Sequence, residues 1–106
     1  MKRSETIKAK KEFNDIIRNS NFHKNKYLVL YYKERIDDQK MFALAISKQV
    51  GKAYLRNYLK RIARVSIDQN KNLFKNGYNY IIMIRKSCAD IKFNELNKSL
   101  IELLQQ

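Results

Sequence analysis

Apolar side chains recur along the first half of the chain with two different periods, and each period predicts a different type of element. Residues 8–19 carry apolar side chains at intervals of three and four, which predicts a helix that ends at the polar segment after it. Residues 27–32 are all aromatic or aliphatic, which predicts a strand. Residues 41–47 predict the returning strand of a hairpin, after a polar turn at residues 37–40.

The second half of the chain contains the strongest helical pattern, at residues 52–67, directly after Gly51. After an Asn-Gly turn, residues 78–85 are almost continuously apolar, which predicts a strand buried on both faces. A last helix opens at Ala89 and Asp90. Its apolar stripe consists of Phe93, Leu96, Leu100, Leu103 and Leu104.

This order of elements predicts an α+β fold, a two-layer α/β sandwich. The length of 106 residues suits one domain with a single modest core. Residues 1–106 contain no internal repeat, low-complexity tract or linker that would divide the chain.

The charge of the chain narrows the choice of partners. With 23 lysine and arginine residues against 10 acidic ones, the net charge is +13, far from the balance of an ordinary soluble enzyme. A polyanion would neutralise this self-repulsion, and nucleic acid, an anionic lipid surface and an acidic protein are the candidates. Residues 47–64 hold six basic and no acidic residues, and they form the densest cationic segment.

A helical wheel divides this segment into two sides. Leu55, Leu59 and Ile62 fall in one sector and predict the packed face. The other side carries Lys52, Arg56, Lys60 and Arg64 at four-residue intervals, extended by Asn57 and Arg61. Like charges at this spacing destabilise an isolated helix by roughly 1 kcal/mol in total. A nucleic acid backbone, whose charges also recur every few ångströms, would relieve that repulsion.

The remaining chemistry of the sequence argues against a self-sufficient catalyst. The single cysteine, Cys88, and the single histidine, His23, cannot build a zinc site between them. We expect Cys88 to be a small, partly buried filler after a strand and His23 an isolated surface residue. Asp37 and Asp38 are typical turn formers, and the scattered acidic residues offer no cluster for two-metal hydrolysis. We therefore predict no catalytic and no metal-binding residue in this chain.

Residues 47–64 also resemble the signature of the bacterial ribonuclease P protein family, whose motif contains a central Arg-Asn-Arg. Nine positions match that pattern: Ser47, Lys48, Gly51, Ala53, Arg56, Asn57, Lys60, Arg61 and Arg64. The likeness extends to a helix with Phe13, a strand ending at Tyr31, a Tyr-Ile-Ile strand at residues 80–86 and a closing amphipathic helix. Two positions depart from it, since Tyr58 replaces the second arginine and Lys52 replaces an asparagine.

The resemblance implies both a fold and a role. The fold is a four-stranded sheet with three helices in the order α-β-β-β-α-β-α, with a left-handed βαβ crossover. The role is that of a protein cofactor to a catalytic RNA, which removes the 5′ leader of precursor tRNA. The implied partners are ribonuclease P RNA and precursor tRNA. The implied metal is Mg²⁺, bound mainly by the RNA, and no organic cofactor is implied.

The resemblance also implies which residues meet RNA. The basic segment would bind the catalytic RNA through Lys48, Lys52, Arg56, Asn57, Lys60, Arg61 and Arg64. Phe13, Ile17 and Tyr31 would line a cleft that binds the leader, where bases can stack on rings. From the residues alone, Phe13 and Ile17 fit a place in the core better, and Tyr31 fits either place.

Three other functions remain open. A ribosomal or DNA-binding protein would also present a basic helix. A peripheral membrane protein would need a larger apolar face than three aliphatic residues. A nuclease acting without RNA would need the carboxylate cluster that the sequence lacks. The chain has neither an apolar signal segment nor a membrane-spanning one, so we expect a soluble, cytoplasmic protein. We also expect that it does not bind membranes and that the free protein is a monomer.

Overall fold

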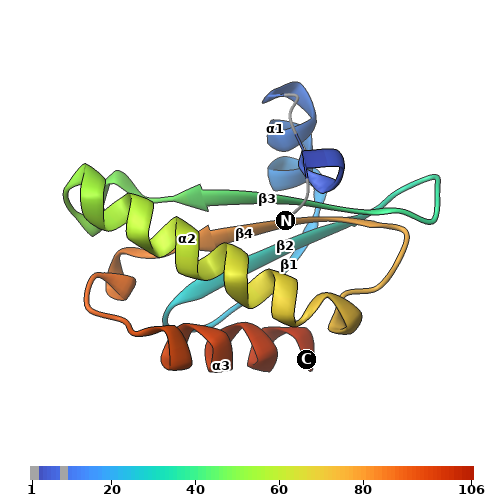
Figure 1. Cartoon of the computed structure of the whole chain (residues 1–106). Helices are drawn as coiled ribbons and strands as arrows, with labels where there is room; N and C mark the ends of the chain where they lie inside the picture. The colour runs from blue at the N-terminus through green and yellow to red at the C-terminus, as the bar shows by residue number, and fades with distance from the viewer. Residues whose placement is uncertain (1–2, 8–9) are drawn as a thin grey trace.

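The computed structural model describes residues 3–7 and 10–106, and its elements follow the order α-β-β-β-α-β-α (Figure 1). The helices are α1 (Lys10–Asn19), α2 (Ala53–Gln69) and α3 (Phe93–Leu104). The strands are β1 (Asn21–Lys24), β2 (Leu28–Glu34), β3 (Lys40–Ile46) and β4 (Tyr78–Ile84). The α+β class and the predicted order of elements are therefore confirmed.

The four strands form one mixed sheet in the order β1-β2-β4-β3. Strand β2 pairs antiparallel with β1 and with β4, whereas β3 pairs parallel with β4. The predicted hairpin between residues 27–32 and 41–47 is wrong, because β4 lies between β2 and β3. The apolar residues of β4 explain this place, since a strand buried on both faces belongs in the interior of a sheet.

The fourth strand is the one that the residue pattern did not locate. Strand β1 contains Asn, Phe, His and Lys, and three of these side chains are exposed. It forms an outer edge of the sheet, and only β2 pairs with it. A short polar edge strand has no apolar alternation to reveal it, because neither of its faces is buried.

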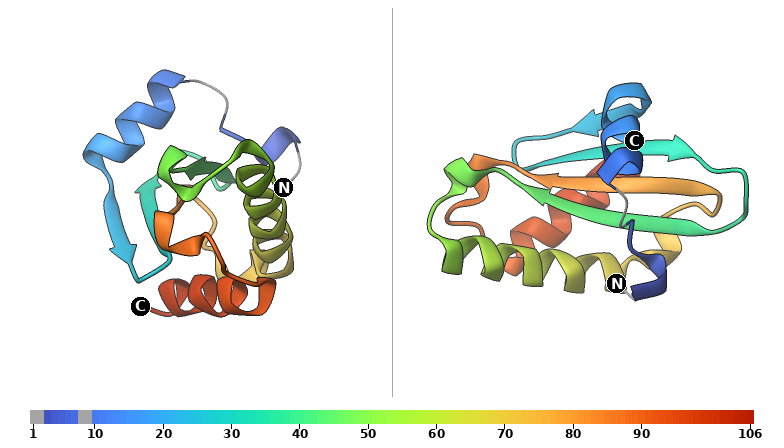
Figure 2. Two further views of the ribbon diagram at one scale, coloured as in Figure 1. Left: turned by 90° about the vertical axis from the view of Figure 1, so that its left-hand side faces the viewer. Right: turned by 90° about the horizontal axis from the view of Figure 1, so that it is seen from above.

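Successive side chains of each strand point to opposite faces of the sheet. On one face, Leu30, Phe42 and Ile82 belong to the main core beneath α2 and α3. On the other face, Ala43 and Ile81 pack in a smaller cluster beneath α1. The sheet with α2 and α3 is the expected two-layer sandwich, and α1 covers part of the opposite face (Figures 1 and 2).

The connection from β3 through α2 to β4 joins two neighbouring parallel strands. Helix α2 packs on the sheet face opposite to α1. Viewed from the α1 side (Figure 2, right), both strands run to the left and β4 lies above β3, while Figure 1 shows α2 on the far side of the sheet from α1. This crossover is left-handed, whereas about 98% of such connections are right-handed. The handedness that the family resemblance implied is therefore present.

The outer edge of β3 is covered in part by the segment before α1. Thr6 bridges Phe42 in parallel, and the backbone N–H of Ile7 donates to the carbonyl oxygen of Phe42 at 2.8 Å. An ion pair of 2.6 Å between Glu5 and Lys71 holds the same segment near the end of α2.

Candidate nucleic-acid interface

Helix α2 is fixed in its rotation by a row of buried side chains. Leu59, Ala63 and Ile67 are almost completely buried in the main core, and Leu55 packs against it. The hydroxyl of Ser66 donates to the Asn97 side chain at 2.7 Å, which ties α2 to α3. The predicted packed face is thus confirmed, and the opposite side of the helix is presented to solvent.

The turn before α2 depends on glycine. Gly51 has a φ of 148°, in a region that other residues rarely adopt, and a Cβ there would lie 3.1 Å from the Leu55 side chain. The Ser47 hydroxyl accepts from the backbone N–H of Gln49 at 3.2 Å in the same turn. This local geometry places Lys48 and Lys52 at the amino end of the helix, and both are exposed.

The polar and basic side chains of α2 differ in how far they are exposed to solvent. Asn57, Arg61 and Arg64 are exposed, as the wheel predicted. Arg56 and Lys60 are half-buried on the flank of the helix and do not lie on its far side. This detail of the prediction is wrong, because Arg56 and Lys60 each lie only about 20° around the helix axis from the buried Ile67 and therefore border the packed face.

These basic side chains are not neutralised by any carboxylate that the structure describes. In the described part of the chain, Lys48, Lys52, Arg56, Lys60, Arg61 and Arg64 form no salt bridge. The Nε atom of Arg56 is buried and finds no hydrogen-bond partner among the described residues. A buried donor without a partner costs about 1–3 kcal/mol, and an anion that reached it would remove that cost.

The three predicted cleft residues come together on the α1 side of the sheet. Phe13, Ile17 and Tyr31 are partly buried and pack around the smaller cluster that contains Ile16 and Ile81. Each therefore contributes to packing while it keeps some surface open. The structure brings the three together as the resemblance implied, and leader binding itself stays a prediction.

A hollow of about 280 Å³ joins these two candidate surfaces. Its walls come from the N-terminal segment, α1, β3 and α2, and its lining residues are Thr6, Ile7, Phe13, Ala43, Leu44, Lys60 and Arg64. Lys60 and Arg64 thus share one depression with the Phe13 ring. Lys48 and Lys52 are not part of it, since they precede the first turn of α2.

One aromatic residue of this face was missed in the sequence. Phe22 of β1 is 53% exposed, and its ring centroid lies 5.9 Å from that of Tyr31. The two residues face each other across the β1–β2 pair. Only knowledge of that pairing could have revealed the contact, because β1 carries no strand signal of its own.

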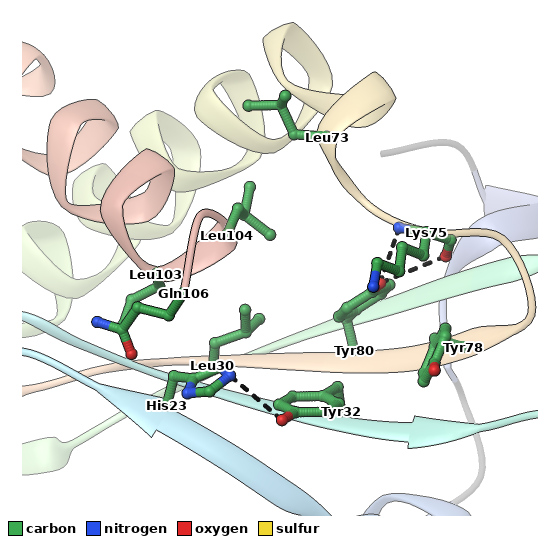
Figure 3. Close-up of a pocket in the computed structure, with 10 residues that line it drawn as sticks. All are labelled: His23, Leu30, Tyr32, Leu73, Lys75, Tyr78, Tyr80, Leu103, Leu104 and Gln106. Atoms are coloured by element: carbon green, nitrogen blue, oxygen red, sulfur yellow. Dashed lines mark hydrogen bonds between the residues drawn. The ribbon is translucent and has the colours of Figure 1, made fainter.

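His23 lies on the other face of the sheet and is not isolated. Its ring stacks on Tyr32 with centroids 5.2 Å apart, and its Nε2 atom is 3.2 Å from the Tyr32 hydroxyl. Both residues line a separate hollow near the carboxyl end of α3, together with Tyr78, Lys75 and Leu104 (Figure 3). The expectation of an isolated surface histidine is therefore wrong.

Cys88 follows strand β4 as expected, but it is buried more deeply than predicted. The side chain is fully buried, and its Sγ atom donates to the carbonyl oxygen of Tyr27 at 3.1 Å. Burial raises the pKa of the thiol to about 11.

The described residues contain neither a cluster of candidate metal ligands nor a helix that could cross a membrane. No group of three or more His, Cys, Asp or Glu side chains in residues 3–7 and 10–106 is placed to hold a metal ion. Within the same ranges, every helix is too short or too polar to cross a bilayer.

Solved structures share this fold across nearly the whole chain. The ribonuclease P protein of Thermotoga maritima superposes with a TM-score of 0.86 at 24% identity, covering 95% of this chain and 96% of that one. The Staphylococcus aureus ribonuclease P protein gives a TM-score of 0.87 at 24% identity, covering 95% and 93%. At this identity the likeness establishes the fold.

Relatives in sequence establish the family as well as the fold. The ribonuclease P protein component of Bacillus cereus (strain ATCC 10987 / NRS 248) is 33% identical over 108 residues, covering 100% of this chain and 93% of the relative. The corresponding protein of Bacillus thuringiensis subsp. konkukian is also 33% identical, with 90% of its length covered. A family model described as Ribonuclease P matches residues 1–106. The chain, with its left-handed crossover around a cationic helix, belongs to the ribonuclease P protein family.

Proposed function

We propose that this chain is the protein subunit of a ribonuclease P holoenzyme, an endoribonuclease whose RNA subunit carries the chemistry. In this role the protein binds ribonuclease P RNA and the 5′ leader of precursor tRNA. It promotes Mg²⁺-dependent removal of the leader, which generates the mature 5′ end of the tRNA. The observation that carries the proposal is the hollow that is lined by Lys60 and Arg64 of α2 and by Phe13 of α1.

The cationic side of α2 suits the RNA subunit. Its basic groups recur once per helical turn, about 6 Å apart along the axis, and form no salt bridge with the described carboxylates. They are therefore available to phosphates without first breaking an internal ion pair. The residues we assign to this contact are Lys48, Lys52, Arg56, Asn57, Lys60, Arg61 and Arg64.

The cleft on the α1 side suits a single strand. Phe13, Ile17 and Tyr31 offer partly open apolar and aromatic surface on which bases can stack without strict sequence preference. Lys60 and Arg64 at the shared hollow would accompany the phosphates of that strand. A leader in the cleft would therefore lie beside the helix that binds the catalytic RNA.

In this proposal the Mg²⁺ ions are bound mainly by the RNA subunit, and no organic cofactor takes part. The protein acts by positioning the leader and by neutralising phosphate charge close to the metal ions. We place this function in the cytoplasm, and we expect the free protein to be a monomer.

Reconstitution tests the proposal. The protein is added to the ribonuclease P RNA of the same genome at low Mg²⁺, and cleavage of a leader-bearing precursor tRNA is measured. We expect cleavage at the mature 5′ end that depends on both components. Lys60→Ala should reduce it, whereas Lys86→Ala, an exposed lysine outside the assigned surface, should not. Cleavage by the protein without RNA would contradict the cofactor role.

One alternative remains, because a ribosomal or other nucleic-acid-binding protein would also use a basic helix. Sequencing of the RNA that copurifies with the protein separates the two. Ribonuclease P RNA should dominate, and a predominance of ribosomal RNA or DNA would favour the alternative. Binding to anionic liposomes at physiological salt would instead favour a membrane-surface role.

A further inference from the structure

The solvent-facing side of α2 carries two tyrosines as well as cations. Tyr54 is 74% exposed and Tyr58 is 40% exposed. They lie one helical turn apart, about 6 Å along the axis, and therefore on the same side of the helix. No aromatic contact among the described residues involves either ring, so neither ring is already stacked on another aromatic side chain there.

Burial in the core does not explain these tyrosines. The residues that hold α2 to the sheet are Leu59, Ala63 and Ile67, on the other side of the helix. At 100° per residue, Tyr58 is about 160° around the axis from Lys60, which lines the hollow beside Phe13. The tyrosines therefore form a surface separate from the proposed leader cleft.

The neighbours of the tyrosines carry positive charge. Arg61 lies three residues after Tyr58, within about 60° of it around the axis, and it is exposed. Asn57 and Arg64 continue the exposed surface toward the cationic flank. An aromatic face beside unpaired cations suits a nucleotide whose base stacks on the ring while its phosphate meets the guanidinium.

Position 58 is also where this chain departs from the family motif, since tyrosine stands in place of the second arginine. An arginine there would offer two parallel hydrogen bonds to a phosphate. A tyrosine offers a single hydroxyl donor in place of the two-pronged guanidinium, and its flat ring adds a surface on which a base can stack. The substitution exchanges an electrostatic contact for a stacking surface.

We infer that Tyr54 and Tyr58 form a stacking site for an unpaired base of the ribonuclease P RNA, with Arg61 binding the adjoining phosphate. This inference rests on the proposed function and adds a contact type to it. The cationic flank of α2 binds phosphates, and the tyrosine side holds a base that is not paired within the RNA.

The absence of tryptophan from the chain allows a direct test. Tyr58→Trp and Tyr54→Trp each introduce a single tryptophan, and the fluorescence of that residue is recorded as the RNA subunit is added. Stacking on a base should quench it. Ile36→Trp is the matched control, because Ile36 is fully exposed in the loop between β2 and β3, at the other end of the molecule from the start of α2 (Figure 1). Its fluorescence should not change.

Affinity measurements separate stacking from charge. Tyr58→Ala and Tyr58→Leu should weaken RNA binding about tenfold, while Tyr58→Phe should keep the affinity of the natural chain. The salt dependence of binding should be the same for all three, because no phosphate contact is lost. Lys60→Ala should instead lower the slope of log K against log salt by about 0.7–0.9. Circular dichroism confirms that each variant is folded.

The outcomes distinguish a failure of the proposed function from a failure of the stacking site. If Lys60→Ala and Arg64→Ala bind RNA with unchanged affinity and slope, the proposed function itself fails. If those variants weaken binding while Tyr58→Ala, Tyr58→Leu and Tyr54→Ala do not, the stacking site alone is overturned. Equal losses for Tyr58→Phe and Tyr58→Ala would also overturn it, because the hydroxyl and not the ring would then be the contact.

Discussion

Lys60 and Arg61 are neighbours in the sequence, but they lie in different surroundings. Lys60 is half-buried and shares a hollow with Phe13, whereas Arg61 is exposed on the side that carries the tyrosines. Arg56 occupies the same flank as Lys60, and its buried Nε atom has no hydrogen-bond partner in the described ranges. The basic residues of α2 therefore differ in what they can contact, although the sequence presents them as one cationic run.

This difference predicts energetic coupling between Lys60 and Phe13. In a double-mutant cycle with Phe13→Ala and Lys60→Ala, binding of leader-bearing precursor tRNA to the holoenzyme should show a coupling energy of at least about 0.5 kcal/mol. The matched cycle of Phe13→Ala with Lys48→Ala should be additive, because Lys48 lies outside the hollow. Additivity in both cycles would mean that the hollow does not act as one site.

Cys88 gives a second prediction for a single residue. Since its thiol is buried and has a pKa of about 11, roughly one molecule in a thousand carries the thiolate at pH 8. A thiolate-specific reagent should therefore label the folded protein at least about a hundredfold more slowly than the denatured one. The chain has no other cysteine, so the rate reports on this residue alone. Rapid labelling of the folded protein would contradict the buried position.

At the scale of elements, the sequence predicted what local pattern determines. The leucine face of α2, the stripe of α3 and the doubly buried β4 all follow from periodicity, and all three are present. The order of the strands was not predictable in this way, because pairing between β2 and β4 joins residues about fifty positions apart. For the same reason the contacts of Phe22 and His23 appeared only once β1 was paired.

The candidate site was predictable to a similar extent. The motif located the basic residues, and the family resemblance grouped Phe13, Ile17 and Tyr31. Neither could show that Lys60 and Phe13 line the same hollow, because that arrangement depends on how α1 and α2 approach β3.

Helix α1 is attached to the sheet by a contact that depends on pH. A hydrogen bond from Lys33 lowers the pKa of the Asp15 carboxyl, with help from the Asn19 side chain. The Lys33 Nζ atom lies 2.6 Å from the carboxylate. A carboxyl whose pKa is lowered by folding stabilises the protein above its unfolded pKa of about 3.9. That contribution is lost as the pH falls through the lower, folded-state pKa.

Asp15→Asn should therefore lower the melting temperature near neutral pH and have less effect near about pH 2. The difference in Tm between the natural chain and the variant should shrink as the pH falls below about 4. Asp38→Asn, at an exposed residue in the loop between β2 and β3, is the control for loss of a carboxylate. A Tm difference that stays constant with pH would show that the charge of the Asp15 carboxylate does not contribute to stability.

At the scale of the whole molecule, one set of charges has two opposite effects. A net charge of +13 makes the free protein repel itself, and salt screens that repulsion. The same salt weakens phosphate binding, because the release of counterions gains less entropy in a more concentrated salt solution. We expect the Tm of the free protein to rise between about 20 and 300 mM salt while RNA affinity falls over the same range. Thermal melts and filter binding in matched buffers check both trends, and a falling Tm would contradict the first.

The segment of Thr6 and Ile7, which covers part of the outer edge of β3, also affects whether copies of the chain associate. An uncovered strand edge offers free N–H and C=O groups to a second molecule, and it is a common starting point for aggregation. Deleting residues 1–7, or replacing Ile7 with proline to remove its N–H donor, should make the protein associate in a concentration-dependent manner, as sedimentation would show. Glu5→Gln, which weakens the ion pair to Lys71 but keeps the backbone pairing, should stay monomeric. The first residues of the chain would then keep a highly basic RNA-binding protein from polymerising through its sheet.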